Sequence, residues 1–174
     1  MGTATSVKAA TTRGLDPAVL ARVVEEGYGA GAWHGPDLKA ALSDVTPDLA
    51  FWRPGVGRHN IAEIALHHAY FVRSVRAQLS GATAEPFVVE GEDWFELSAD
   101  GPLGWQHVLA EVDSQQRRLA AVVADLAAGG APRYGREVDP FGLVLGITCH
   151  AVYHAGQVQL VKRLRVKGPA EGPG

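Results

Sequence analysis

Cysteine is scarce in this sequence, and its scarcity excludes two kinds of architecture. Cys149 is the only cysteine among 174 residues, which excludes an intramolecular disulfide framework and a zinc site built from four cysteines. One unpaired cysteine fits a reducing compartment, so we expect a cytoplasmic protein. The formal net charge is −3 and no run of Lys or Arg stands out, so the sequence does not indicate a nucleic-acid surface.

Long hydrophobic runs are scarce as well, and only residues 141–161 approach the length of a membrane span. A span needs about 18–20 residues without charge. Because this run contains two histidines and two glutamines (His150, His154, Gln157 and Gln159), we do not expect it to lie in lipid. The N-terminus has no apolar segment of the kind found in signal peptides, so no membrane partner is expected.

The rest of the composition is typical of one globular domain with a full hydrophobic core. Hydrophobic residues make up 47% and charged residues 20% of the chain, as in ordinary soluble proteins, and the length suits a single domain. We predict that this domain spans residues 15–166, between tails at residues 1–14 and 167–174.

Apolar residues recur at helical spacing and no strand pattern is present, so we predict an all-α fold. Asp16 before Pro17 indicates one helix start, and Asn60-Ile61-Ala62-Glu63 predicts a capping box that starts another. Gly81 and Gly129 are typical of helix ends. The predicted helical segments cover residues 17–29 with a continuation at 36–42, a short turn at 47–50, and then 60–79, 104–128 and 141–164.

Residues 82–102 form a long connection between the second and third long segments. This connection is long enough to cross back along the molecule, so the two helices that it joins can run parallel. We therefore predict a four-helix bundle in up-down-down-up order.

His150 and His154 lie four residues apart in the last apolar segment. On a helix they share one face, with their Cβ atoms about 5–6 Å apart. Two imidazoles on neighbouring turns can bind one metal ion. Position 151 is alanine, whereas the H-E-x-x-H motif of zinc proteases has glutamate there, so a protease mechanism is not supported.

A third ligand could come from His67 or His68 in the second long segment. Helical periodicity places His68 near the centre of that segment's apolar stripe and His67 on its flank. A site between two helices need not lie on the centre line of a stripe, so the residues alone leave both histidines open.

Four stretches of the chain, in this order, resemble the DinB/YfiT-like superfamily of bacterial metal-binding bundles. They are Trp33-His34-Gly35-Pro36, residues 50–54, residues 59–67 and Gly146-Ile147-Thr148-Cys149-His150-Ala151-Val152-Tyr153-His154-Ala155-Gly156-Gln157. The resemblance implies a divalent metal ion held by His67, His150 and His154. The family position that matches His68 is usually aliphatic, so His68 departs from the pattern and could pack, hydrogen-bond or compete as a ligand.

The resemblance also implies a class of chemistry. Three neutral imidazoles suit Zn²⁺ or Ni²⁺ and leave a position for water or substrate. Assigned members of the family are thiol S-transferases or isomerases that use low-molecular-weight bacterial thiols. We therefore favour a metal-dependent transferase that uses such a thiol with a small-molecule substrate. The alternatives are a small-molecule hydrolase and a non-catalytic metal- or ligand-binding stress-response protein, and a homodimer is expected by family analogy.

Three further residues are candidates for roles beside the metal. Gln157 lies on the same face, one turn beyond His154, and is our candidate catalytic residue because it could orient a metal-bound water or a substrate; helix packing is the alternative. Glu63 could act as a base, although the capping box also explains it. Cys149 is turned about 100° from His150 along the helix, and we predict that it is a small buried residue.

Loop histidines and aromatic residues are the remaining candidates. His34 and His59 precede helix starts, where they could line the mouth of the bundle or face solvent, and His107 is expected at the surface. Four aromatic residues could frame a pocket near the metal or anchor the core and loops: Trp33, Trp52, Tyr70 and Trp94.

Overall fold

The structure is a computed structural model that describes residues 17–29, 32–128, 135 and 137–167. Within these residues every regular element is a helix, which confirms the all-α class. The helices are α1 (Pro17–Gly27), α2 (Leu38–Leu42), α3 (Pro47–Ala50), α4 (Ile61–Ser80), α5 (Trp105–Ala127) and α6 (Pro140–Lys167). The expected cap at Asp16 and the predicted tails, apart from residue 167, lie outside the described residues.

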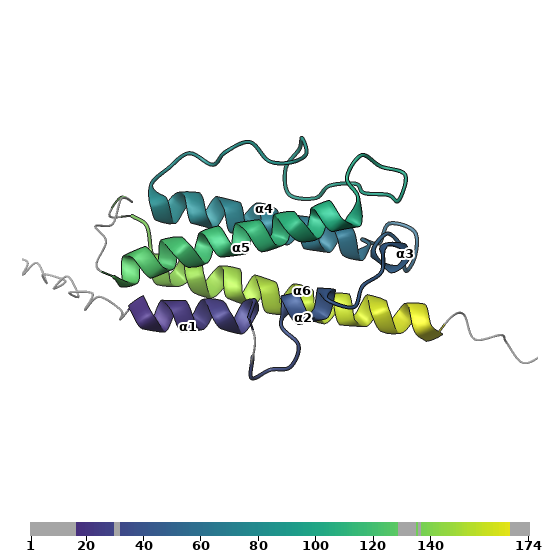
Figure 1. The fold of residues 1–174 in the computed structure, drawn as a ribbon, viewed down its shortest axis with the longest axis horizontal. Coiled ribbons are helices and arrows are strands. Elements are labelled where there is room, and N and C mark those ends of the chain that lie inside the picture. Colours follow the sequence, from purple (N-terminus) through teal and green to yellow (C-terminus); the bar gives the residue numbers. More distant parts are fainter. Residues whose placement is uncertain (1–16, 30–31, 129–134, 136, 168–174) are drawn as a thin grey trace, which may run out of the picture.

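The four longer helices pack around a shared interior. α1 contacts α5 and α6, and α4 contacts the same two helices from the other side, while α2 continues along α6. In Figure 1, α1 and α6 run from left to right, whereas α4 and α5 run from right to left. α4 and α5 can run in the same direction because the connection between them passes back along the outside of the molecule (Figure 1).

α4 begins and ends at residues whose chemistry explains its bounds. The Glu63 backbone N–H donates to Asn60 Oδ1 at 2.9 Å, and the Asn60 backbone N–H donates to Glu63 Oε2 at 3.3 Å, which completes the predicted capping box. Gly81 ends the helix with a left-handed backbone (φ 62°), a conformation that glycine adopts without steric cost. The sequence therefore determines the register of the helix that carries His67.

α1 approaches α6 closely through Gly27. A Cβ atom on Gly27 would lie 3.0 Å from Ala151 Cβ and 3.2 Å from the Thr148 carbonyl oxygen, so a side chain there would push the helices apart. Beside this contact, Thr148 Oγ1 donates to the Val23 carbonyl at 3.2 Å. These contacts fix α1 against the turn of α6 from which His150 projects.

The apolar core consists of two clusters that meet near the middle of the long helices. One contains α2, the first half of α4, the start of α5 and the second half of α6. The other contains α1, the second half of α4, the end of α5 and the start of α6. Near their boundary lie His67 and His68 on α4, Gln116 on α5 and His150 on α6. Because buried polar groups need partners, this boundary is where functional contacts are expected.

Cys149 is exposed, so the prediction that it is buried is wrong. The turn of about 100° away from His150 places it on the outer face of α6, which no described helix covers. α6 is apolar on more than one side, and hydrophobicity alone therefore did not separate its inner face from its outer one.

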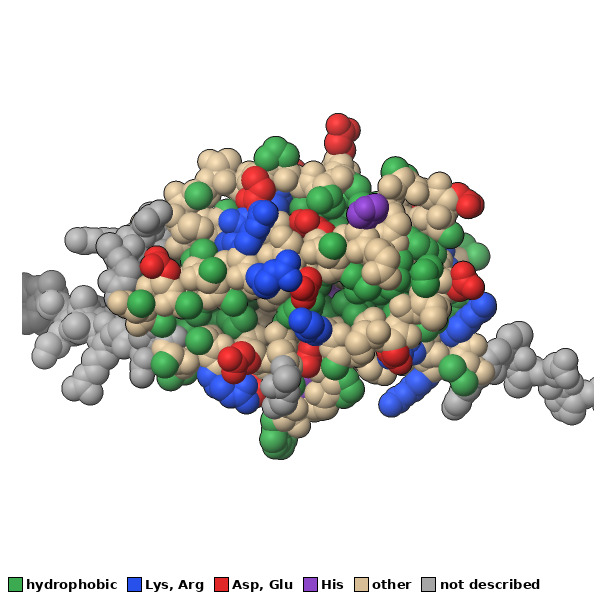
Figure 2. All heavy atoms as spheres, in the orientation of Figure 1, with side chains coloured by type: hydrophobic (Ala, Val, Ile, Leu, Met, Phe, Trp, Pro, Cys, Tyr) green, Lys and Arg blue, Asp and Glu red, His purple; other side chains and the backbone are tan. Residues whose placement is uncertain are grey.

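None of the described helices is both long and apolar enough to cross a lipid bilayer. On the face shown in Figure 2, acidic and basic side chains lie next to one another across the middle of the molecule. Ion pairs bring opposite charges together among the described residues: Lys39 and Arg117 both pair with Asp113, and Arg118 pairs with Glu85. This face therefore carries no large patch of one sign.

Candidate metal centre

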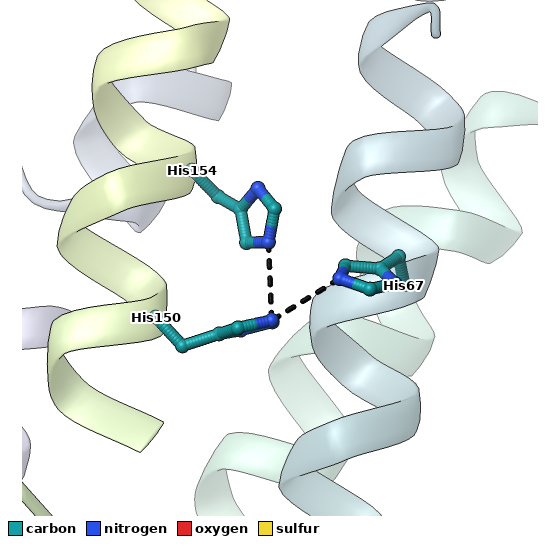
Figure 3. A group of neighbouring side chains, drawn as sticks. All are labelled: His67, His150 and His154. Atoms are coloured by element: carbon teal, nitrogen blue, oxygen red, sulfur yellow. Dashed lines mark hydrogen bonds between the residues drawn. The ribbon is translucent and has the colours of Figure 1, made fainter. Parts of the chain in front are cut away.

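Three histidines from two helices converge in the interior. His150 and His154 project from neighbouring turns of α6, and His67 projects toward them from α4 (Figure 3). Nε2 of His150 lies 3.1 Å from Nε2 of His67 and 3.1 Å from Nε2 of His154. One nitrogen from each ring lies within 4.8 Å of the others, so the three rings surround a point that one ion could occupy.

Asp93 determines which ring nitrogen His67 presents to this point. Nδ1 of His67 lies 2.9 Å from the Asp93 carbonyl oxygen and 3.0 Å from its Oδ1. Since both oxygens accept hydrogen bonds, the ring proton is on Nδ1 and the Nε2 lone pair is free. Asp93 has a left-handed backbone (φ 65°), which aspartate tolerates better than most residues.

Gln157 plays the same part for His154. Gln157 Nε2 donates to Tyr153 Oη at 3.1 Å, and this leaves Oε1 facing His154 Nδ1 at 2.6 Å. His154 Nδ1 therefore donates, and its Nε2 lone pair faces His150. The amide of Gln157 thus contacts the outer nitrogen of His154, and its predicted contact with a water or a substrate stays a prediction.

His150 has a different kind of partner, which is the second histidine of α4. Its Nδ1 lies 3.0 Å from Nδ1 of His68, and Nε2 of His68 lies 2.7 Å from Nε2 of Gln116 on α5. His68 is 0% exposed, and both of its ring nitrogens have these partners. His68 therefore directs neither nitrogen at the point that the other three histidines share.

Burial favours the neutral form of every ring in the cluster. Burial lowers the pKa of His150 to about 3, reinforced by the neighbouring imidazoles, and that of His154 to about 4, opposed by its hydrogen bond to Gln157. Burial also lowers the pKa of His67, against the effect of Asp93, and lowers the pKa of His68 well below its usual range. The neutral imidazole is the form that binds metal ions.

The donor set fits a divalent ion. A tetrahedral ion with metal–nitrogen bonds of about 2.0–2.1 Å separates its ligand nitrogens by about 3.3 Å, and two of the three pairs here are 3.1 Å apart. The lone pairs of His67 and His154 both point toward His150 Nε2, where one proton can satisfy only one of them. A cation at the shared point would satisfy all three nitrogens.

Trp94 covers the His67 side of the cluster. Its ring stacks on His67 with centroids 3.8 Å apart and on His59 with centroids 3.7 Å apart. Trp94 and His59 also line a cavity of about 250 Å³, together with Arg53 and Arg58. A small molecule in this cavity would touch the ring that stacks on His67, so the predicted pocket roles of Trp94 and His59 have a geometric basis.

The contacts of Glu63 give it a structural role. Its buried carboxylate forms an ion pair with Arg53, contacts His59 Nδ1 at 3.1 Å and accepts from the Leu97 backbone N–H at 2.9 Å. Together with the capping box, these contacts tie the connection and the loop before α4 to the helix.

The other predicted candidates lie elsewhere. His34 contacts the Glu26 carbonyl at 2.9 Å, and His107 is exposed as expected. Trp33 is 93% exposed. Trp52 lies under the Arg165 guanidinium at 5.3 Å, and Tyr70 packs edge-to-face on Phe87.

Sequence reasoning missed Asp93 and Gln116 as partners of the histidines. Asp93 lies in an aperiodic connection, where neither spacing nor composition indicates the partner of a side chain. Gln116 did leave a signal, because it follows Val112 by four residues and precedes Leu119 by three. A glutamine within that apolar stripe is a buried polar group that needs a partner.

Across the residues that the structure describes, the fold is all-helical and contains a largely buried cluster of three histidines that could hold a metal ion. The family model of the DinB superfamily matches residues 31–158. This match covers most of the chain, includes all three histidines and shows that the chain belongs to the DinB superfamily. No curated protein and no solved structure matches the chain.

Proposed function

We propose that His67, His150 and His154 bind one divalent ion, with Zn²⁺ or Ni²⁺ the best-suited candidates. One observation carries this proposal. Each of the three rings has a hydrogen-bond partner at Nδ1, and each turns Nε2 toward a common point. Three protein ligands leave at least one position for another group, as in catalytic zinc sites.

We further propose that the protein is a metal-dependent enzyme that transfers or adds a low-molecular-weight thiol to a small molecule. The bound ion would supply Lewis acidity, which lowers the pKa of a coordinated thiol or water. Asp93 and Gln157 would orient their ligands, and Trp94 would limit access of water from the His67 side. Membership of the superfamily supports this choice of reaction class.

Measurements can distinguish two alternative functions from the proposed transferase. A metal-dependent hydrolase would use the same histidines with water in place of the thiol. A non-catalytic metal- or ligand-binding protein of a stress response would hold the ion without turnover. Neither has a structural observation in its favour over the transferase.

The wider setting of this site is part of the same proposal. We propose that the helices form a four-helix bundle in up-down-down-up order, supported by the helix directions in Figure 1. We also propose a cytoplasmic homodimer that acts on small molecules, without nucleic-acid or membrane partners. The face shown in Figure 2 carries acidic and basic side chains side by side.

Metal analysis of the purified protein tests the site directly. We expect one equivalent of divalent metal per chain in the wild type, and almost none in His67→Ala or His150→Ala. His107→Ala is the matched control because this histidine is exposed and outside the cluster. Unchanged metal content in His150→Ala would refute the proposed metal site.

Activity assays then separate the reaction classes. We expect thiol consumption with an electrophilic small molecule that depends on added metal and is absent in His67→Ala. Release of product without thiol would favour the hydrolase. Metal binding without turnover of any thiol and electrophile pair would favour the binding protein.

A further inference from the structure

On the side away from the proposed ion, His68 contacts His150, and Gln116 contacts His68. The chain of contacts runs from Gln116 on α5, through both nitrogens of His68, to Nδ1 of His150. His68, which joins Gln116 to His150, is 0% exposed, so water does not reach its ring. A chain of two hydrogen bonds therefore links α5 and α4 to His150 of α6, which is a proposed metal ligand.

The direction in which these hydrogen bonds are donated decides whether His150 can bind a metal ion through Nε2. If the Gln116 amide donates to His68 Nε2, the His68 proton is on Nδ1 and points at His150 Nδ1. A neutral His150 then carries its own proton on Nε2, where the ion would bind. If the Gln116 amide oxygen faces His68 instead, each ring proton moves to the other nitrogen and the Nε2 lone pair of His150 is free.

The amide of Gln116 has room to adopt the second orientation. An amide group has nearly the same shape with its oxygen and nitrogen exchanged. Gln116 also lines a cavity of about 430 Å³ between α1 and α5, beside Tyr28 and Asp113. Rotation of the amide therefore requires no repacking of the apolar core.

We propose that His68 and Gln116 are positioning residues that fix the ring orientation and tautomer of His150, so that His150 presents Nε2 to the metal ion. This inference rests on the proposed metal site. In this role, His68 neither binds the metal ion nor merely fills space in the core. In many metal proteins a carboxylate or a carbonyl oxygen accepts the outer proton of a ligand histidine, and here a second histidine and an amide replace it.

Cobalt binding to four variants tests the proposal. Loss of an outer-shell partner typically weakens metal affinity by about 10–100-fold, so we expect about 10-fold or greater weakening of Co²⁺ affinity in His68→Phe and in Gln116→Met. Gln116→Glu should retain the wild-type affinity, because a carboxylate can only accept from His68. Gln115→Met is the matched control, since Gln115 is 2% exposed but donates to Glu111.

The ring N–H protons of the cobalt-loaded protein give a second readout, which a merely structural role would not change. Proton NMR should show three shifted and exchangeable N–H signals, one for Nδ1 of each ligand. In His68→Phe and Gln116→Met, only the signal of His150 should shift or exchange faster with solvent. The signals of His67 and His154 should stay, because Asp93 and Gln157 still accept from them.

The outcomes distinguish the two proposals. Wild-type protein that binds no Co²⁺ would overturn the metal site and the positioning role with it. The positioning role alone would be overturned if the wild type binds Co²⁺ and His68→Phe and Gln116→Met show the same affinity and the same N–H signals. The same holds if Gln116→Glu weakens binding as much as Gln116→Met. The Gln116 variants keep His68 in place, so they decide the question if His68→Phe does not fold.

Discussion

Asp93 shows how one residue outside the helices can orient a histidine that a helix carries. Among the described residues it is the one non-glycine residue with a positive φ, and both its carbonyl and its carboxylate contact His67. Backbone conformation and side-chain chemistry act together at this position. Substitutions can separate them, because glycine keeps the conformation and loses the carboxylate.

We predict that Asp93→Gly retains metal and that Asp93→Val loses it. Glycine adopts a positive φ freely, so the carbonyl still accepts from His67 and affinity should fall by less than about 10-fold. Valine is β-branched and is strained at positive φ, so it should displace the carbonyl and weaken binding by at least another factor of about 10. Isothermal titration with Zn²⁺ measures both, and equal affinities would show that the carbonyl does not hold His67.

The histidines also predict how stability depends on pH. The folded pKa values of about 3 for His150 and about 4 for His154 lie below the ordinary value of 6.5. Well above pH 6.5 both histidines are neutral in the folded and in the unfolded chain, and their full contribution to stability is present. As pH falls from 6.5 toward 4, the unfolded chain binds protons that the folded chain does not, so the free energy of unfolding falls.

For each proton that the unfolded chain binds and the folded chain does not, the free energy of unfolding falls by about 1.4 kcal/mol per pH unit. Urea unfolding of metal-free protein between pH 7.5 and 4.5 measures the slope. We expect a smaller slope in His150→Leu than in the wild type. Stability that is constant or rises as the pH falls through this window would contradict the prediction.

At the scale of elements, the start of α4 joins three segments through one carboxylate. Glu63 caps the helix, pairs with Arg53 in the preceding loop and accepts from Leu97 in the connection. The Glu63 carboxylate therefore holds the helix, the preceding loop and the connection together. Loss of that carboxylate should loosen the connection that carries Asp93 and Trp94.

We predict that Glu63→Ala lowers the free energy of unfolding by about 3 kcal/mol. The change removes a cap contact and the ion pair with the exposed Arg53, and it leaves the buried Leu97 backbone N–H without its acceptor. Glu92→Ala is the control, since Glu92 is exposed in the same connection and should change stability by less than about 0.5 kcal/mol. Chemical denaturation gives both values, and similar losses in the two variants would rule out a special role for Glu63.

The elements were predictable from local chemistry, whereas the contacts between them were only partly so. Spacing along one helix predicts the capping box at Asn60, the helix end at Gly81 and the shared face of His150 and His154 on α6. The prediction of His67 rather than His68 as a ligand needed the family resemblance, because both are buried and periodicity favoured His68. Asp93 reaches His67 through a backbone conformation that no pattern predicts, and the exposure of Cys149 depends on which face of α6 is covered.

At the scale of the whole molecule, the outer face of α6 remains apolar. Leu145, Tyr153, Leu160 and Leu164 are 41–63% exposed along it. Gly146 and Gly156 lie on the same helix with open space around them, so a second helix could approach closely. This face is our candidate for the interface of the proposed homodimer.

We predict that Leu160→Asp converts the dimer to a monomer. A charge in the middle of an apolar interface would be buried without a partner, which is strongly unfavourable. Size-exclusion chromatography with light scattering measures the mass, and Val56→Asp, at a residue that is fully exposed in a loop, should remain dimeric. A monomeric wild type at micromolar concentration would refute the dimer itself.

The stack of Trp94 on His67 has a consequence for the speed of metal exchange. His67 is 6% and His154 is 2% exposed, and the connection that carries Trp94 is fastened at Glu63 and at His67. If the proposed ion leaves past Trp94, part of this cover has to open first, so we expect its release into a chelator to depend on the rate of that opening. Trp94→Ala should therefore speed release much more than it weakens affinity, and residence time rather than binding strength is what the cover controls.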